Sequence, residues 1–350
     1  MDKEKVIQSN SKFRLYLTLF TIIALAILIY GLRHQIGDAI NNFGKVHSWA
    51  LLLIIPIEAL NYDAYARLYK SLLKTLGREV PYRALYRATL ELNFVNHILP
   101  SGGVSGVSYF SIRLKGEDIP TTKSTFVQLL KFILLYVSFL PILVIALLLL
   151  AVRGHTNNLI LVLSSSIITA IIIGTFIGVY VIESRARISS FLTGVTKVIN
   201  WLVHLVLRRR PETIKLETAQ MAFNELHDNY KVLKTNWRQL RMPLFYTTIC
   251  NITEIVAVYV VYIAFGQFVN VGAVILAYAV ANFAGLISVL PAGVGVFEGL
   301  MTAVLTATGI PAALSIPVTI MYRICSMFVQ LVPGYILYQR ALKDGLTTKL

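Results

Sequence analysis

Long apolar stretches separated by short polar segments dominate this chain. Six of them approach or exceed the roughly 20 residues that a helix needs to cross a bilayer. No segment shows the ten-residue alternation of a membrane β-strand, so the expected fold class is an all-α polytopic membrane protein. We expect full transmembrane helices at about residues 13–32, 48–70, 124–150, 159–182, 242–265 and 312–338.

Two further apolar segments are interrupted by proline and glycine. The first, at 84–112, breaks where Pro100 precedes Gly102 and Gly103, and the second, at 271–308, breaks after Pro291. Both pieces of the first segment are short for a full crossing, and the second break is followed by a short segment at about 293–308. Backbone that is broken at membrane depth must line a cavity or be buried in protein. The pattern therefore predicts two re-entrant helical hairpins.

Positive charge is concentrated on one side of the predicted spans. The chain has 32 Lys and Arg against 17 Asp and Glu, a formal net charge of +15. The order of the spans places 27 of these 32 cations on the same side, which the positive-inside rule assigns to the cytoplasm. We therefore expect a multi-pass protein of the cell (cytoplasmic) membrane with both termini in the cytoplasm. Anionic lipid headgroups at that face are the expected partner of the excess charge, and no basic-aromatic motif indicates nucleic acid.

The two halves of the chain carry corresponding features. Each has a span with acid and amide groups, then a broken hairpin, then a span with one cation. Pro100 precedes Lys131 by 31 residues, and Pro291 precedes Arg323 by 32. The first hairpin is expected to enter from the cytoplasm and the second from outside, which predicts inverted repeats. We expect one integral membrane domain, 1–350, with repeat 1 at about 48–150, a cytoplasmic amphipathic connector at 184–241 and repeat 2 at 242–340.

Ionisable residues inside the predicted spans are the candidate functional groups, because a charge at the bilayer centre costs roughly 2.5–3.5 kcal/mol on insertion scales. We expect Lys131 and Arg323, one near each hairpin, to bind a phosphate group. The acids would balance these cations, bind a headgroup amine or carry a coupling proton. Glu298 and Arg323 alternatively form a buried ion pair that only fixes the second hairpin. The candidate substrate-binding residues are Lys131, Arg323, Glu298, Glu254, Glu58, Asp63, Asn93, Asn96, Gly102, Gly103, Asn282, Gly293 and Gly295.

Three other ionisable residues near the membrane also have structural interpretations. Asp63 lies one helical turn before Arg67, so an ion pair at the interface is an alternative to a binding role. Glu91 lies one turn after Arg87 and has the same alternative. His97, beside the first break, is interpreted as a core histidine in preference to a proton carrier.

The residues around both breaks resemble those of a known family. The similarity rests on the run Leu290-Pro291-Ala292-Gly293-Val294-Gly295-Val296-Phe297-Glu298, on Met321-Tyr322-Arg323, and on the upstream Asn93, Asn96 and Leu99-Pro100-Ser101-Gly102-Gly103. This pattern resembles the transmembrane (flippase) region of lysylphosphatidylglycerol synthases and their stand-alone relatives, over about residues 10–340. The resemblance implies a helical domain that moves an aminoacylated phospholipid or another lipid across the cytoplasmic membrane. It also implies functional roles for Glu298 and Arg323.

Three classes of function remain open at this point. The first is a lipid flippase that passes a headgroup along the hairpins while the acyl tails stay in the bilayer. The second is a membrane-embedded enzyme or accessory subunit that acts on a lipid-linked sugar or polyprenyl phosphate, with Glu58, Asp63 or His97 as general base. The third is an ion-coupled transporter of a small solute.

We expect a transporter and not an enzyme. The sequence contains no metal-ligand cluster, nucleophile elbow or phosphate loop, and no cofactor is expected. The chain ends at Leu350 without the soluble aminoacyl-transferase domain of the full-length family, so the resemblance implies transport without synthesis. The expected substrate is a membrane phospholipid, and a homo-oligomer is left open.

Overall fold

The structure is a computed structural model that describes residues 46–98, 104–152, 158–190, 216–287 and 293–343, with scattered single residues between 19 and 38 and Thr193. Within these residues the chain is helical and contains no strand, which confirms the all-α class. Several predicted features lie outside the described residues: the span at 13–32, both Pro-Gly breaks with Gly102 and Gly103, and the connector between 194 and 215.

Four stretches of helix are long and apolar enough to cross a membrane. They are α7 (Thr121–Val152), α8 (Asn158–Ile182), η1 (Trp237–Leu240) with α11 (Arg241–Ala264), and α14 (Ala312–Lys343). These four coincide with the spans expected at 124–150, 159–182, 242–265 and 312–338. The chain is therefore an integral multi-pass membrane protein.

The span expected at 48–70 is divided into α3 (Ser48–Leu51) and α4 (Ile54–Thr75). Helix α4 is less apolar than the four candidate spans, because Glu58, Asn61 and Asp63 interrupt its apolar residues. Glu58 and Asn61 are nevertheless buried, since they lie on the side of α4 that packs against its neighbours, chiefly α11 and α5.

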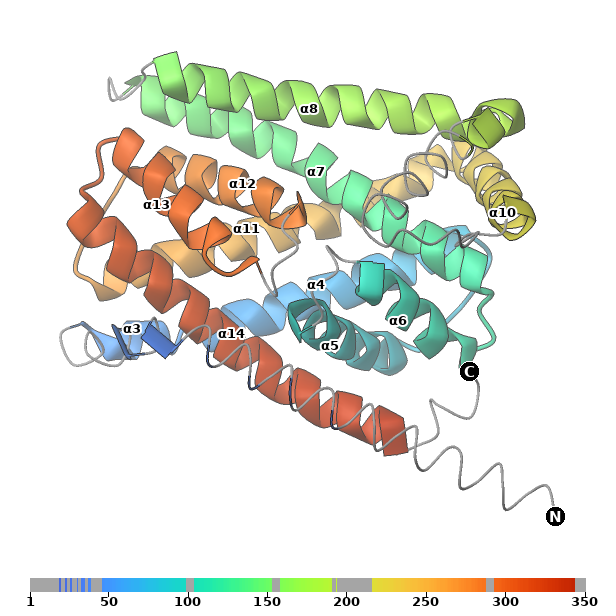
Figure 1. Ribbon diagram of the computed structural model, residues 1–350, viewed down its shortest axis with the longest axis horizontal. Helices are drawn as coiled ribbons and strands as arrows, with labels where there is room; N and C mark the ends of the chain where they lie inside the picture. The colour runs from blue at the N-terminus through green and yellow to red at the C-terminus, as the bar shows by residue number, and fades with distance from the viewer. Residues whose placement is uncertain are drawn as a thin grey trace, which may run out of the picture.

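Two pairs of short helices flank the Pro-Gly breaks. The first pair is α5 (Tyr82–Ile98) and α6 (Val104–Lys115), and the second is α12 (Val271–Ile287) and α13 (Val296–Ala307). In Figure 1, α5 and α6 lie in the half of the molecule that holds α10 (Leu216–Thr235), whereas α12 and α13 lie in the half that holds α3. The two pairs therefore lie toward opposite ends of the long helices.

The packing of the helices is reciprocal between the two halves of the chain. Helix α5 packs against α14, and its counterpart α12 packs against α7, while α4 and α11 pack against each other. Glycine allows both crossings to be close. A Cβ at Gly334 of α14 would lie 2.8 Å from the Leu90 carbonyl oxygen of α5, and a Cβ at Gly272 of α12 would lie 2.5 Å from the Ala146 carbonyl oxygen of α7. The same kind of contact thus recurs at corresponding crossings.

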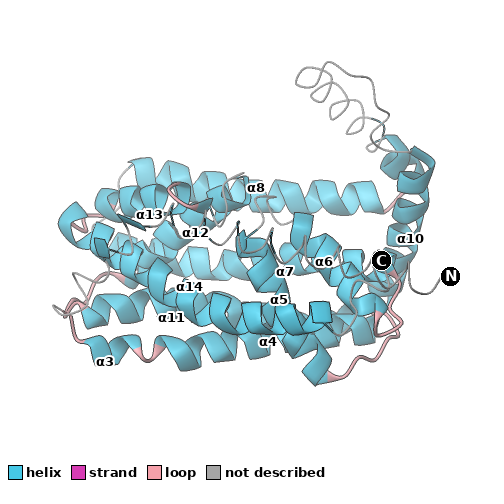
Figure 2. Cartoon of the chain, turned by 60° about the horizontal axis from the view of Figure 1, so that its bottom comes forward, coloured by secondary structure: helices cyan, strands magenta, loops and turns pink. Residues whose placement is uncertain are grey.

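Helix α10 lies across one end of the bundle, beside α7 and α8 (Figures 1 and 2). Two exposed ion pairs attach it to the segment after α8: Arg185 to Asp228 at 2.9 Å and Lys234 to Glu183 at 2.6 Å. The Lys234 ammonium holds the pKa of Glu183 below its usual range. Part of the predicted connector is therefore a helix that packs on the end of the bundle, through these ion pairs and through Leu226 and Leu233, which are buried in an apolar cluster.

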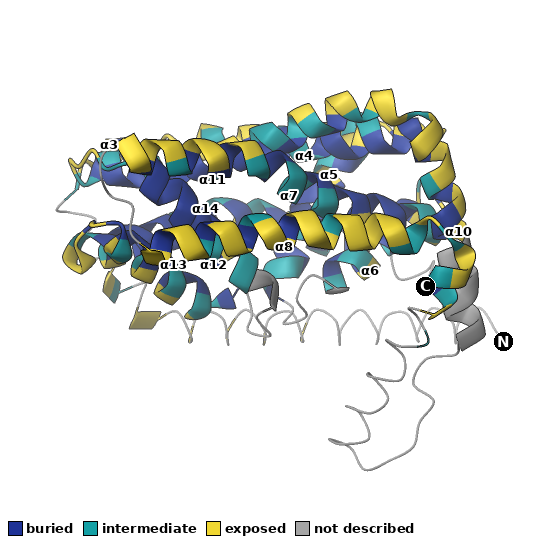
Figure 3. Cartoon of the chain, turned by 90° about the horizontal axis from the view of Figure 1, so that it is seen from above, coloured by how far each residue is buried: buried dark blue, intermediate teal, exposed yellow. Residues whose placement is uncertain are grey.

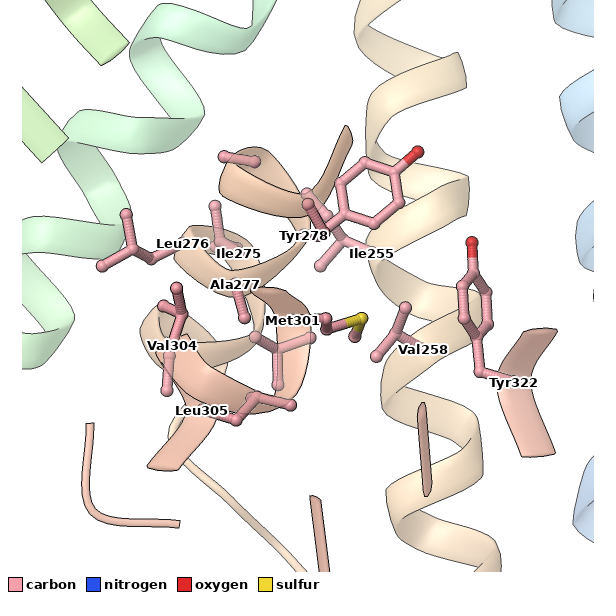
Figure 4. Packing of buried hydrophobic residues seen from close by; sticks show 14 of the residues in the cluster. Ile255, Val258, Ile275, Leu276, Ala277, Tyr278, Met301, Val304, Leu305 and Tyr322 are labelled. Carbon is pink, nitrogen blue, oxygen red and sulfur yellow. The ribbon is translucent and has the colours of Figure 1, made fainter. Parts of the chain in front are cut away.

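Apolar packing fills the half of the bundle that contains α12 and α13. In Figure 4, Val258 of α11, Leu276 and Ala277 of α12, and Met301 and Leu305 of α13 lie around one another. By contrast, one side of α8 is exposed along much of its length (Figure 3) and carries large apolar side chains. We assign this side to the lipid, because apolar surface of this extent is unfavourable in water.

Candidate functional site

A cavity of ≈ 330 Å³ lies between the two halves of the chain, lined from both. Its wall carries two chemically different kinds of side chain. Charged, amide and hydroxyl groups come mainly from α4, α5, α11 and α14, whereas an apolar region comes from α7 and α8. The apolar region consists of Phe132, Leu135, Phe139, Ile167 and Ile171.

The structure brings many of the predicted site residues to this one cavity, although they are up to 230 positions apart in sequence. Four others do not line the cavity: Glu58, Asp63, Glu298 and Gly295. The predicted residues that line it are Asn93, Asn96, Lys131, Glu254, Asn282, Gly293 and Arg323.

Lys131 supplies a cation that no acid of the described residues neutralises. The residue is 6% exposed, lies on α7 and lines the cavity. Its Nζ lies 4.0 Å from the ring centroid of the neighbouring Phe132, and no ion pair to it occurs within the described ranges. A buried ammonium without a counter-charge is costly, so its position at a cavity favours binding of an external anion.

Arg323, the second predicted cation, has a carboxylate partner. Its Nε donates to Glu298 Oε1 at 2.9 Å, and its guanidinium carbon lies 4.6 Å from the centroid of the Phe297 ring. Both side chains of the ion pair are about nine-tenths buried, at 11% and 10% exposure. Arg323 therefore lines the cavity as one half of a neutral pair. This contact is the buried ion pair that the sequence offered as the alternative to a binding role.

The start of α13 explains the glycines of the second motif. Gly293 and Gly295 have φ values of 64° and 85°, in the left-handed region that favours glycine. The Gly295 amide donates to Glu298 Oε2 at 2.6 Å and so closes the first turn of the helix. Gly295 was a candidate substrate-binding residue, but Glu298 already accepts the hydrogen of its amide.

Glu58 and Glu254 lie in a network of neutral donors. Gln330 Nε2 donates to Glu58 Oε2 at 3.0 Å, and Tyr322 Oη donates to Glu254 Oε2 at 2.9 Å. Asn61, one turn after Glu58 on α4, donates to Glu254 Oε1 at 3.4 Å and more closely to Thr253 at 2.8 Å. The two carboxylates are thus held from α4, α11 and α14 without a cation in hydrogen-bonding contact.

The polar residues of α5 are mostly engaged with protein. Asn93 donates to the Tyr62 hydroxyl and to Gln330 Oε1, the latter at 3.0 Å. His97 Nδ1 lies 2.8 Å from the Asn93 carbonyl oxygen and donates to it in the matching tautomer. Asn96 packs its side chain against Gly106 of α6, where any Cβ would collide with it. These contacts agree with the interpretation of His97 as a core histidine at the cavity wall.

Two predicted acids lie away from the cavity. Asp63 accepts from Arg67 Nε at 2.7 Å and from the Tyr82 hydroxyl at 2.6 Å, which confirms the structural alternative of a pair one turn apart. Glu91 had been matched with Arg87, but its partner is Arg113 Nε at 3.0 Å. The prediction was wrong because it considered one helix alone, whereas α6 packs back against α5 and brings its own arginine.

Some residues of the network were not selected from the sequence. Gln330 connects Glu58 with Asn93, and Tyr322 is the hydroxyl donor to Glu254. A periodicity signal exists for Gln330, because it lies seven residues after Arg323 and therefore on the same face of the helix. An unpaired glutamine in an apolar helix is a weaker signal than a charge, and it was not singled out.

Comparisons with known proteins agree with the resemblance seen in the motifs. The family model described as "Lysylphosphatidylglycerol synthase TM region" matches residues 16–334. A UPF0104 membrane protein of Methanocaldococcus jannaschii is 23% identical over 330 residues, which cover 93% of this chain and 94% of that protein. A UPF0104 membrane protein of Methanothermobacter thermautotrophicus is 22% identical over 319 residues, with 88% and 89% covered, and one of Pyrococcus horikoshii is 23% identical over 290 residues, with 82% and 85% covered.

Proposed function

Because the chain belongs to the family of the lysylphosphatidylglycerol synthase transmembrane region, we propose that it is a transporter that moves a phospholipid between the leaflets of the cell membrane. The observation that carries this proposal is the cavity with two kinds of side chain in its wall. Lys131 of α7 and the amides of Asn96 and Asn282 line it together with apolar side chains of α7 and α8. An amphiphile with an anionic headgroup matches both kinds of side chain.

The size of the cavity fits a headgroup and not a whole lipid. A volume of ≈ 330 Å³ lies at the lower end of the range of about 300–1,000 Å³ for pockets that hold small molecules. Two acyl chains do not fit in that space and would have to remain in the bilayer. The apolar region of the wall provides their route, because Ile167 and Ile171 belong to α8, whose other faces carry exposed apolar residues.

The phosphate is assigned to Lys131. Its ammonium has no carboxylate partner within the described residues, whereas the Nε of Arg323 is already engaged with Glu298. Arg323 lines the same cavity and adds positive potential, and the amides of Asn93, Asn96 and Asn282 add hydrogen-bonding capacity. The headgroup would therefore be anionic or zwitterionic.

The path across the membrane would use both broken helix pairs. We propose that α5–α6 and α12–α13 are re-entrant hairpins that enter from opposite faces, and that the two halves form an inverted repeat. The reciprocal packing of α5 on α14 and α12 on α7 supports this arrangement. In this topology α4 and residues 13–32 complete six full spans, and both termini lie in the cytoplasm. The cationic segments then meet anionic headgroups at the cytoplasmic face.

The test of this function is leaflet transfer of fluorescent phospholipids by the purified protein in vesicles, followed with a membrane-impermeant quencher. Ile171→Trp places a bulky ring at the apolar wall and is expected to slow transfer. Ile172→Trp is the matched control, because Ile172 is 41% exposed and the next residue on the same helix, whereas Ile171 is 4% exposed.

The proposal fails if vesicles with the wild-type protein transfer no phospholipid faster than empty vesicles. It also fails if Ile171→Trp and Ile172→Trp transfer at the same rate. Uptake of a soluble anion without lipid transfer would favour the solute transporter. Chemical conversion of a lipid-linked sugar or polyprenyl phosphate would favour the enzyme.

A further inference from the structure

Two carboxylates of the membrane core, Glu58 and Glu254, have no cation bonded to them in the described part of the chain. Glu58 is 1% exposed, and its Oε1 has no hydrogen-bond partner there. Glu254 lines the cavity, whereas Glu58 does not line it but accepts from Gln330, which does. Buried ionised carboxylates normally pair with a cation or accept several hydrogen bonds.

The two carboxylates belong to one structural unit. Glu58 and Asn61 are three residues apart on α4, and Asn61 donates to Glu254 on α11. Gln330 of α14 holds Glu58, and Tyr322 of the same helix holds Glu254. Ser326 lies between Tyr322 and Gln330 in sequence, is buried, and has a hydroxyl without a partner within the described ranges. The arrangement leaves unused hydrogen-bonding capacity beside Glu58.

The charges that surround the cavity do not cancel. Glu298 and Arg323 form a neutral pair, which leaves Lys131 against Glu58 and Glu254 and a net charge of −1. The breaks at 99–103 and 288–292, which are not described, contain no ionisable residue in the sequence. One bound proton would make this core neutral.

Other titratable side chains of α4, α5, α11, α12 and α14 line the cavity or lie beside it. His97 donates to the Asn93 carbonyl oxygen, as a neutral imidazole can, and the phenols and the thiol are neutral at ordinary pH. None of these groups supplies the missing positive charge. The uncharged neighbours are Tyr62 and Tyr65 of α4, His97 of α5, Cys250 of α11, Tyr278 of α12 and Tyr322 of α14.

We propose that Glu58 and Glu254 bind one proton between them and that this proton drives lipid transfer. The proton comes from a hydronium ion of the water in the cavity, which Glu254 lines. One O–H bond of the hydronium ion breaks and leaves its electron pair on a water molecule, while a lone pair of one of the two carboxylates forms the new O–H bond. Protonation removes one negative charge and allows the new hydroxyl to donate a hydrogen bond. The existence of the proton site is independent of the proposed function, whereas its coupling to lipid transfer rests on that function.

A proton is favoured over a metal cation by the groups present. Hard cations prefer several oxygen ligands at once. No group of three or more His, Cys, Asp or Glu that could hold a metal ion occurs among the described residues. The neighbours of the two carboxylates are amide and hydroxyl groups, which can donate hydrogen bonds to a carboxylate and accept one from a protonated carboxyl group.

The proton site is tested by infrared spectroscopy of the purified wild-type protein at neutral pH. A protonated carboxyl group has a C=O stretch separate from that of carboxylates, and we expect one such band in the wild type. Glu58→Gln and Glu254→Gln should each abolish it. Glu225→Gln, at an exposed position of α10, should leave it unchanged. Persistence of the band in both core variants, or its absence from the wild type, would overturn the proposal.

Coupling is tested in vesicles that carry a pH gradient. One coupled proton allows a gradient of one pH unit to shift the leaflet ratio of the lipid by up to about tenfold. The wild type and Glu225→Gln should show this shift, and Glu58→Gln and Glu254→Gln should not. A response to a sodium gradient at constant pH in place of the proton gradient would refute the assignment.

The two proposals fail in different ways. Absence of any lipid transfer by the wild type contradicts the proposed function, yet the infrared band still decides whether the proton site exists. Lipid transfer that is indifferent to pH contradicts only the coupling. If the glutamine variants do not fold, Tyr322→Phe serves instead, because it removes the hydroxyl donor to Glu254 and should move the pH at which the band appears.

Discussion

The ion pair between Glu298 and Arg323 permits a quantitative test of its structural role. Removal of one partner from a buried ion pair costs about 3–5 kcal/mol, because the other charge is left without compensation. Glu298→Gln keeps an oxygen that accepts from the Gly295 amide. Its cost should therefore come mainly from the Arg323 charge, which loses its carboxylate partner while it stays buried. Arg323→Gln also loses the contact with the Phe297 ring, which is worth about 0.5–2 kcal/mol. We therefore expect Arg323→Gln to be the more destabilising change.

The double variant Glu298→Gln with Arg323→Gln separates this interpretation from simple loss of two residues. Two neutral amides can still form a hydrogen bond, so the double variant should cost less than the sum of the single variants. The expected coupling energy is about 2–3 kcal/mol, at the upper end of the range for residues in contact. The assay is unfolding of the purified protein in mixed micelles with increasing denaturing detergent. Additive single effects would refute the conclusion that Glu298 acts through Arg323.

Two further predictions concern packing and orientation. Gly334→Ala should destabilise the protein by about 1–3 kcal/mol, because its Cβ would lie 2.7 Å from Phe94 Cβ. Gly299→Ala, at a helix position where a Cβ would have no atom within 4 Å, should instead stabilise the protein by about 0.5–1 kcal/mol. If both variants raised, or both lowered, the midpoint of thermal unfolding, this packing would be contradicted. In a background without Cys250 and Cys325, an impermeant maleimide added to whole cells should label Phe268→Cys but not Lys115→Cys. Labelling of both from one side would contradict the proposed topology.

Helix positions followed from hydrophobicity, whereas the partners of the polar residues did not. The apolar stretches at 124–150 and 312–338 correspond closely to α7 and α14. The length of such a stretch is set by the thickness of the bilayer, so it can be predicted without knowing how the helices pack. The partner of Glu91 depends instead on how α6 folds back onto α5. Spacing within one helix suggested Arg87, and only the fold shows Arg113.

The residue types of the candidate site were predictable from the sequence, but the different roles of its two cations were not. Charges in apolar helices singled out Lys131, Glu254 and Arg323, and the fold brings all three to one cavity. Sequence treated the two cations as equivalent because both follow a Pro-Gly break at similar spacing. They differ because Glu298 pairs with Arg323, whereas no acid of the described residues pairs with Lys131. Such differences depend on contacts between helices that sequence spacing does not encode.

The most direct test of the central claim is the effect of Lys131→Met on stability and on lipid transfer, measured on the same preparation. Met keeps the length of the side chain and removes an unpaired buried charge, so the free energy of unfolding should rise, by at most about 2.5–3.5 kcal/mol. Loss of a charge-assisted contact of about 1.5–3 kcal/mol should slow phospholipid transfer on the order of 10- to 150-fold.

Lys70→Met is the control, because Lys70 is exposed on α4 and loses the same charge. It should transfer phospholipid at the wild-type rate, and Lys131→Arg, which keeps the charge, should retain part of the activity. The account predicts that Lys131→Met gives a protein that is at least as stable as the wild type and strongly impaired in transfer. Transfer at the wild-type rate by folded Lys131→Met would contradict it.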